Sequence, residues 1–159
     1  IDEGLAIVKA IHSRYDGKKH NPWNEIECGD HYARAMASYG VLQAIQGYWY
    51  DGPKGIMGFE PKLRKDDFIG FFNAAEGWGN ISQIRKNNKQ TNCVEVKFGR
   101  LYLDKLQVNL AEGTDINNIK ASLNNKNIVV SATNTSGYTE IALNGLQMRS
   151  GDKLQITFE

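Results

Sequence analysis

The spacing of hydrophobic positions changes near residue 60, so the chain divides into two parts with different predicted structure. In the first part, largely apolar side chains recur every three or four residues, the period of a helix with one apolar face. One run comprises Leu5, Val8, Ile11, His12 and Tyr15, and a second comprises Tyr32, Met36, Tyr39, Leu42 and Ile45. Asp16-Gly17 follows the first run, and a glycine at this place commonly ends a helix. The pattern predicts a helix up to Tyr15 and another from Gly29 or Asp30 to Gln46.

From about Phe68 onward, apolar and polar residues alternate with the period of a β-strand. The alternating apolar residues are Val94, Val96 and Phe98, then Leu106, Val108 and Leu110, and finally Leu154, Ile156 and Phe158. The turn signals between and beside such runs are Asn87-Asn88, Gly113, Asn124-Asn125, Ser136-Gly137, Asn144-Gly145 and Ser150-Gly151. Short strands separated in this way predict an antiparallel β-sandwich or meander. The expected fold class is α+β, with a helical segment at 1–60 and a β domain at 61–159.

Composition and charge narrow the possible partners. The 159 residues are 41% hydrophobic and 23% charged, with a net charge of +1, which is typical of a folded globular chain. No field of one sign would attract nucleic acid, and no apolar run approaches the ~20 residues of a membrane span. The chain starts at Ile1 without an initiator methionine, so we expect a mature product or a fragment. We expect no nucleic-acid partner, no membrane span, no metal and no cofactor.

Chemically active residue types are densest in 21–34, which reads NPWNEIECGDHYAR. Glu25 precedes the expected second helix, and Arg34 lies in its first turns. A carboxylate and a guanidinium suit a neutral polyhydroxyl ligand, because one accepts hydroxyl protons and the other donates to hydroxyl oxygens. Trp23 offers a flat apolar face to a sugar ring, and His31 is a further candidate ligand contact. These four residues are the predicted substrate-binding set.

Other interpretations of the same segment remain open. Glu25 or Glu27 could form an ordinary ion pair with Arg34 that fixes the start of a helix, and His31 could be structural. A nucleophilic pair of Cys28 and His31 lacks a third, orienting group in view. A metal site that combined Glu27 with Cys28 and His31 would match no familiar ligand spacing.

Residues Asn21 to Ser38, NPWNEIECGDHYARAMAS, resemble a C-terminal signature of glycoside hydrolase family 116, which includes non-lysosomal glucosylceramidases and bacterial β-glucosidases. The flanking residues agree with the signature. Before it stand Glu3-Gly4-Leu5 and Arg14-Tyr15-Asp16-Gly17, and after it stand Gly47-Tyr48 and Tyr50-Asp51-Gly52-Pro53. Residues Phe68 to Gln83 resemble a continuation in some bacterial members. Beyond about Leu110 no resemblance is found.

The resemblance implies that the helical segment is the end of an (α/α)6 catalytic barrel in a retaining β-glycosidase. In that family the glutamate nucleophile and the aspartate acid/base lie well upstream, so no catalytic residue is assigned in this chain. Glu25 and Arg34 match the pair that holds hydroxyls of the sugar in the cleavage subsite. The implied partners are a β-glucoside or related glycoside and the remainder of the barrel, and the chain alone would be inactive or nearly so.

Two alternatives to the glycosidase hypothesis concern the β part. It could be a non-catalytic carbohydrate-binding module, or a structural module that shields the barrel. Glu76 and Trp78 could face a ligand, but Trp78 is expected rather to be a core or edge aromatic. In either case, two helices of a twelve-helix barrel would leave apolar faces exposed, so self-association through these faces is expected.

Overall fold

The computed structural model describes residues 1–20 and 35–159, which fall into two compact units, Ile1–Leu42 and Gln43–Glu159. In the first unit, helix α1 spans Asp2–His12 and a short 3-10 helix spans Gly17–Lys19. Asp16 caps the 3-10 helix by accepting a 2.8 Å hydrogen bond from the backbone N–H of Lys19. No helix among the described residues is both long and apolar enough to cross a membrane.

Helix α2 spans Ala35–Gln46, which confirms the described part of the second predicted helix. Its last residues belong to the second unit. Gln46 is fully buried there, and its Oε1 accepts a 2.9 Å hydrogen bond from the backbone N–H of Phe71. A Cβ on Gly70 would lie 2.0 Å from the same oxygen, so glycine is needed where the glutamine crosses the strand. The end of α2 is therefore fixed to strand β3.

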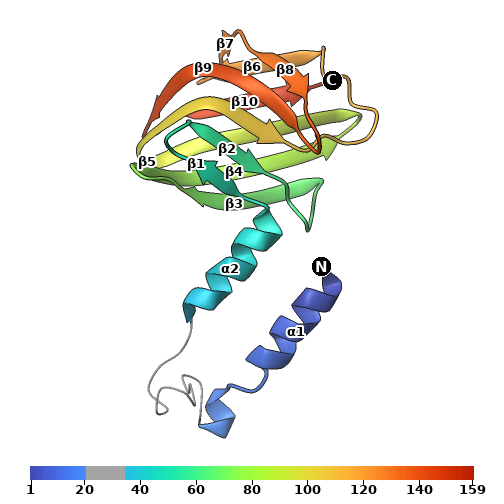
Figure 1. Cartoon of the computed structure of the whole chain (residues 1–159), viewed down its shortest axis with the longest axis vertical. Helices are drawn as coiled ribbons and strands as arrows, with labels where there is room; N and C mark the ends of the chain where they lie inside the picture. Colours follow the sequence, from blue (N-terminus) through green and yellow to red (C-terminus); the bar gives the residue numbers. More distant parts are fainter. Residues whose placement is uncertain (21–34) are drawn as a thin grey trace. The chain divides into compact units, whose positions relative to one another are not determined.

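The second unit contains ten strands, nearly all paired antiparallel (Figure 1). Their bounds are β1 Trp49–Asp51, β2 Ile56–Phe59, β3 Asp67–Asn73, β4 Gly77–Lys86, β5 Lys89–Val108, β6 Ile119–Leu123, β7 Lys126–Ile128, β8 Ser131–Asn134, β9 Thr139–Arg149 and β10 Lys153–Phe158. The α+β fold class is confirmed. The pairing of β2 with β5 is parallel and departs from a purely antiparallel arrangement.

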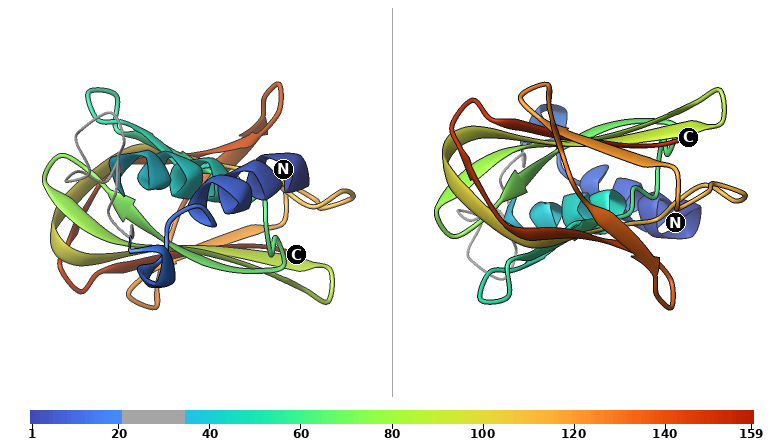
Figure 2. Two further views of the ribbon diagram at one scale, coloured as in Figure 1. Left: turned by 90° about the horizontal axis from the view of Figure 1, so that it is seen from below. Right: turned by 90° about the horizontal axis from the view of Figure 1, so that it is seen from above.

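Strand β5 is 20 residues long and belongs to both groups of paired strands in this unit. Its first half pairs with β4 and β10, and the order there is β3-β4-β5-β10-β6-β7. Its second half pairs with β2 and β9, and the order is β1-β2-β5-β9-β8. Figure 2 shows the two groups of strands curving over one another as two layers.

The hydrophobic core lies between these layers. It includes residues from both halves of β5 together with β2, β3, β9 and β10. Its largest fully buried apolar side chains are Phe59, Phe72, Phe158, Met57, Ile81, Leu103, Leu106, Ile141, Met148, Leu154 and Ile156. The predicted alternation of Leu154, Ile156 and Phe158 is confirmed, since all three are buried.

Three strand predictions differ from the structure. The runs at 94–98 and 106–110 were expected as separate strands, but β5 spans both through Val108 without an intervening turn. Strands β1 and β2 lie before residue 61, within the segment expected to be helical. Asn144-Gly145 lies inside β9, at a register shift opposite Leu103 and Lys105, rather than in a turn between strands. A β-bulge accommodates such residues without ending the strand.

Candidate functional site

The predicted substrate-binding residues Glu25, Arg34, Trp23 and His31 all lie outside the described residues. The same is true of Cys28 and Glu27. The structure therefore leaves their roles as predictions. The described part of α2 begins at Ala35, and the other end of that helix is held through Gln46.

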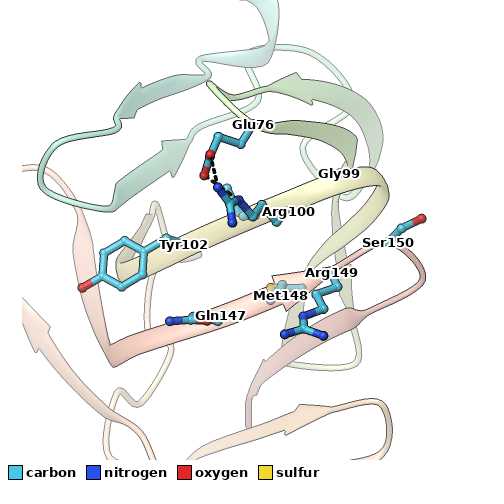
Figure 3. A pocket seen from close by; sticks show the side chains of 9 residues that line it. Glu76, Gly99, Arg100, Tyr102, Gln147, Met148, Arg149 and Ser150 are labelled. Carbon is cyan, nitrogen blue, oxygen red and sulfur yellow. Dashed lines mark hydrogen bonds and ion pairs between the residues drawn. The ribbon is translucent and has the colours of Figure 1, made fainter.

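Among the described residues, a shallow pocket of about 820 Å³ lies over the second half of β5 and the end of β9 (Figure 3). Its charged and larger polar side chains come from three places in the chain. Glu76 comes from the β3–β4 turn, Arg100 and Tyr102 from β5, and Gln147 and Arg149 from β9. Arg100 pairs in register with Arg149, and Tyr102 pairs with Gln147, so these four side chains share one face of the two strands.

A bend in β5 brings Glu76 to Arg100. Gly99 has φ +76°, and a Cβ there would lie 2.1 Å from the carbonyl oxygen of Glu76. Only glycine tolerates both the backbone conformation and the close approach. The backbone N–H of Arg100 donates a 3.0 Å hydrogen bond to that same carbonyl oxygen, which ties the turn to the strand.

The side chains of Glu76 and Arg100 form a two-pronged ion pair. Arg100 Nε lies 2.9 Å from Glu76 Oε2, and Arg100 Nη2 contacts Glu76 Oε1. The hydrogen bonds from Arg100 hold the pKa of the Glu76 carboxyl below its usual value, and the carboxylate raises the pKa of Arg100. Both side chains are exposed, Arg100 by 71% and Glu76 by 57%. The pair is therefore ionised, preorganised and accessible to a ligand.

An exposed aromatic pair lies beside this ion pair. Trp78 on β4 is directly opposite Phe98 on β5, and the two ring centroids are 6.3 Å apart with planes inclined by 20°. Trp78 is 51% exposed and Phe98 is 63% exposed. Phe98 was expected on the same face as Val94 and Val96, and this is wrong. The register shift between Trp78 and Gly79 pairs Gly79 with Val96, so Lys97 is an extra residue and Phe98 turns outward.

Six described carboxyl groups accept hydrogen bonds from a neighbouring backbone N–H, amide, lysine or arginine, and these hydrogen bonds lower their pKa values. These groups are Asp16, Asp51, Glu76, Glu140, Asp152 and Glu159. A glycosidase needs one carboxyl with a raised pKa to protonate the leaving group. Within 1–20 and 35–159 no group of three or more potential metal ligands is found either.

No family model matches the sequence, and no curated protein matches it. The fold is similar to that of an α-L-rhamnosidase from Dictyoglumus thermophilum, with a TM-score of 0.45 and 12% sequence identity. The match covers 82% of this chain and 14% of that enzyme. At this distance the likeness transfers neither an activity nor a substrate to this chain.

Proposed function

We propose that this chain is the C-terminal part of a retaining β-glycosidase that acts on β-glucosides, to which it contributes sugar-binding residues but neither catalytic carboxylate. The observation that carries the proposal is the signature NPWNEIECGDHYARAMAS at 21–38, in which Glu25 and Arg34 form the sugar-binding pair. Trp23 and His31 would supply further contacts to the sugar. The nucleophile and the acid/base belong to upstream parts of the enzyme.

The exposed apolar residues of the helical segment support a role within a larger barrel. Helix α1 has no buried residue, and Ile7 is 62% exposed while Ile11 is also exposed. Tyr39 and Leu42 on α2 are exposed as well. Apolar helix faces of this kind are normally covered by neighbouring helices, and the remainder of an (α/α)6 barrel would supply them.

The lowered pKa of the Glu76 carboxyl supports a binding role for this residue. A pair such as Glu76 and Arg100 keeps its carboxylate ionised, which suits hydroxyl recognition and does not suit proton donation. The β domain would then serve as an accessory module. The second candidate is a structural module that only covers the barrel. This candidate is favoured because the β domain has its own hydrophobic core, formed by residues from Met57 to Phe158.

The proposal is tested by measuring hydrolysis of 4-nitrophenyl β-glucoside. The 159-residue chain alone should show no turnover, whereas the longer enzyme should hydrolyse the substrate with retention at the anomeric carbon. In the longer enzyme, Glu25→Gln or Arg34→Lys should lower kcat/KM by about 100-fold, because a misplaced sugar reacts far more slowly. The control variant is Glu112→Gln, on an exposed loop of the β domain. Turnover by the isolated chain, or full activity of both variants, would refute the proposed roles.

A further inference from the structure

We propose that the outer surface at the bend of β5 is a second carbohydrate site, which binds a neutral oligosaccharide chain. Trp78 and Phe98 would form its stacking platform, and Glu76 and Arg100 would bind sugar hydroxyls. The site consists of residues of the β unit and shares none with the predicted pair Glu25 and Arg34. Its test is therefore independent of the proposed glycosidase function.

The aromatic pair lies on the surface rather than in the core. The ring centroids are 6.3 Å apart and the ring planes are inclined by 20°, so the two nearly parallel rings are stacked. Both rings keep about half or more of their surface exposed. The C–H face of a pyranose ring is apolar and flat on this scale, and it would cover a surface that otherwise faces water.

The platform and the ion pair are continuous along two paired strands. Arg100 is two residues beyond Phe98 on β5, and Glu76 is two residues before Trp78, in the turn that leads into β4. Gly77 pairs with Gly99 between them, and the backbone N–H of Arg100 donates a hydrogen bond to the carbonyl oxygen of Glu76, so the aromatic pair and the charged pair follow one another along the same two chain segments. Arg100 and Tyr102 lie two residues apart on β5, and both line the pocket of Figure 3 together with Glu76.

Two asparagine side chains lie near Trp78, on strands β3 and β4. Asn73 on β3 is directly opposite Trp78, and Asn80 is opposite Phe71, whose exposed ring lies diagonal to Trp78 on this face. Amide groups both donate and accept hydrogen bonds, as sugar hydroxyls do. Aromatic faces that alternate with amides, a carboxylate and a guanidinium match a chain of polyhydroxyl rings.

Charge balance favours a neutral glycan over an anionic ligand. Arg100 is compensated by Glu76, and Lys97 beside the platform is compensated by Glu95. Arg149 adds one positive charge at the far side of the pocket. A nucleic acid or an anionic membrane surface would need several uncompensated cations in a row, and this surface does not provide them.

The test is isothermal titration calorimetry of the full chain against hexasaccharides of β-linked glucose, xylose and mannose, extended by a glycan array. Trp78→Ala should weaken binding of the recognised oligosaccharide about tenfold, because one stacking face is lost. Arg100→Gln alters an exposed side chain outside the core and should weaken binding by a similar factor. Tyr138→Ala removes an exposed aromatic at the opposite end of β9, and Arg34→Ala removes the other predicted site; both should leave this binding unchanged.

Three results would overturn the proposal. The first is no binding of any neutral glycan by the full chain. The second is binding that Arg34→Ala abolishes while Trp78→Ala and Arg100→Gln leave it intact, which would place the glycan elsewhere. The third is self-association that Trp78→Ala relieves without any glycan binding, which would assign the surface to a protein contact. Thermal unfolding of each variant verifies that it remains folded.

Discussion

The helical segment and the β unit differ in how far their apolar side chains are buried. Residues 43–159 bury a continuous core between two layers, with side chains such as Phe72 and Leu103 fully removed from water. Helix α1, in contrast, leaves Ile7 and Ile11 exposed. Since burial of apolar surface supplies most of the driving force for folding, the β unit has its own source of stability, whereas α1 depends on neighbours that the described residues do not provide.

The contrast also separates the two candidate sites. The pair predicted from the signature, Glu25 and Arg34, belongs to the helical segment, whereas Trp78 and Phe98 lie in the β unit, which has its own core. Rigid scaffolds hold binding residues more accurately than isolated segments do. We therefore expect sugar binding by the β unit to survive in isolation and binding through Glu25 and Arg34 to require the longer enzyme.

The largest effect is expected in the core of the β unit. Phe72→Ala should lower the free energy of unfolding by about 3–5 kcal/mol, because it removes a fully buried ring and leaves a cavity. Ile69→Ala, on the exposed face of the same strand, should change it by less than about 0.5 kcal/mol. Urea unfolding followed by circular dichroism measures both. Equal effects of the two substitutions would contradict the position of the core.

The junction between α2 and the sheet should show an intermediate effect. Gln46→Ala removes the acceptor for the Phe71 N–H and should cost about 1–3 kcal/mol, since a partly buried donor loses its partner. Gln43→Ala, one turn earlier and exposed, should be neutral. Hydrogen exchange at the Phe71 amide offers a local readout, which should accelerate in Gln46→Ala. Unchanged exchange would mean that this hydrogen bond does not hold the helix end.

A smaller, pH-dependent effect is expected at the C-terminal strand. Hydrogen bonds from Lys120 and Lys89 lower the pKa of Glu159 from 4.5 to about 2. A carboxyl with a lowered pKa in the folded state contributes stability above its unfolded pKa and loses that contribution as the pH falls through the folded value. The difference in melting temperature between the native chain and Glu159→Gln should therefore be largest above pH 4.5 and vanish near pH 2. A difference that grows toward pH 2 would contradict the ion-pair assignment.

The smallest effect should follow removal of residues 1–42. If the β unit is self-sufficient, residues 43–159 alone should unfold cooperatively within about 2 °C of the full chain. Differential scanning calorimetry of the two proteins makes the comparison. Loss of a cooperative transition would show that the helical segment contributes to the stability of the sheet.

Much of the fold is predictable from local patterns. Apolar residues that recur with a period of 3.6 residues identify the helices, and those that recur with a period of 2 identify the strands. The turn signals Asn87-Asn88, Asn124-Asn125 and Ser150-Gly151 lie between strands in the structure. The platform was only partly predictable. Residue type marks Glu76 and Trp78 as possible ligand contacts but favours Trp78 as a core or edge aromatic, and simple alternation places Phe98 with Val94 and Val96 because it takes no account of a bulge. Arg100 gave no signal, since its partner is 24 residues away.

The sequence by itself determined the α+β class, the order of helices before strands and the signature that motivates the glycosidase proposal, because each depends on neighbouring residues or on a contiguous motif. The tertiary structure decided that β5 joins two layers, that Phe98 turns outward, and that Glu76 meets Arg100 beside Trp78. Those features depend on strand register and on the bend at Gly99. Register is fixed by pairing between distant segments, and a one-residue shift moves a side chain to the opposite face, so local periodicity could not decide it.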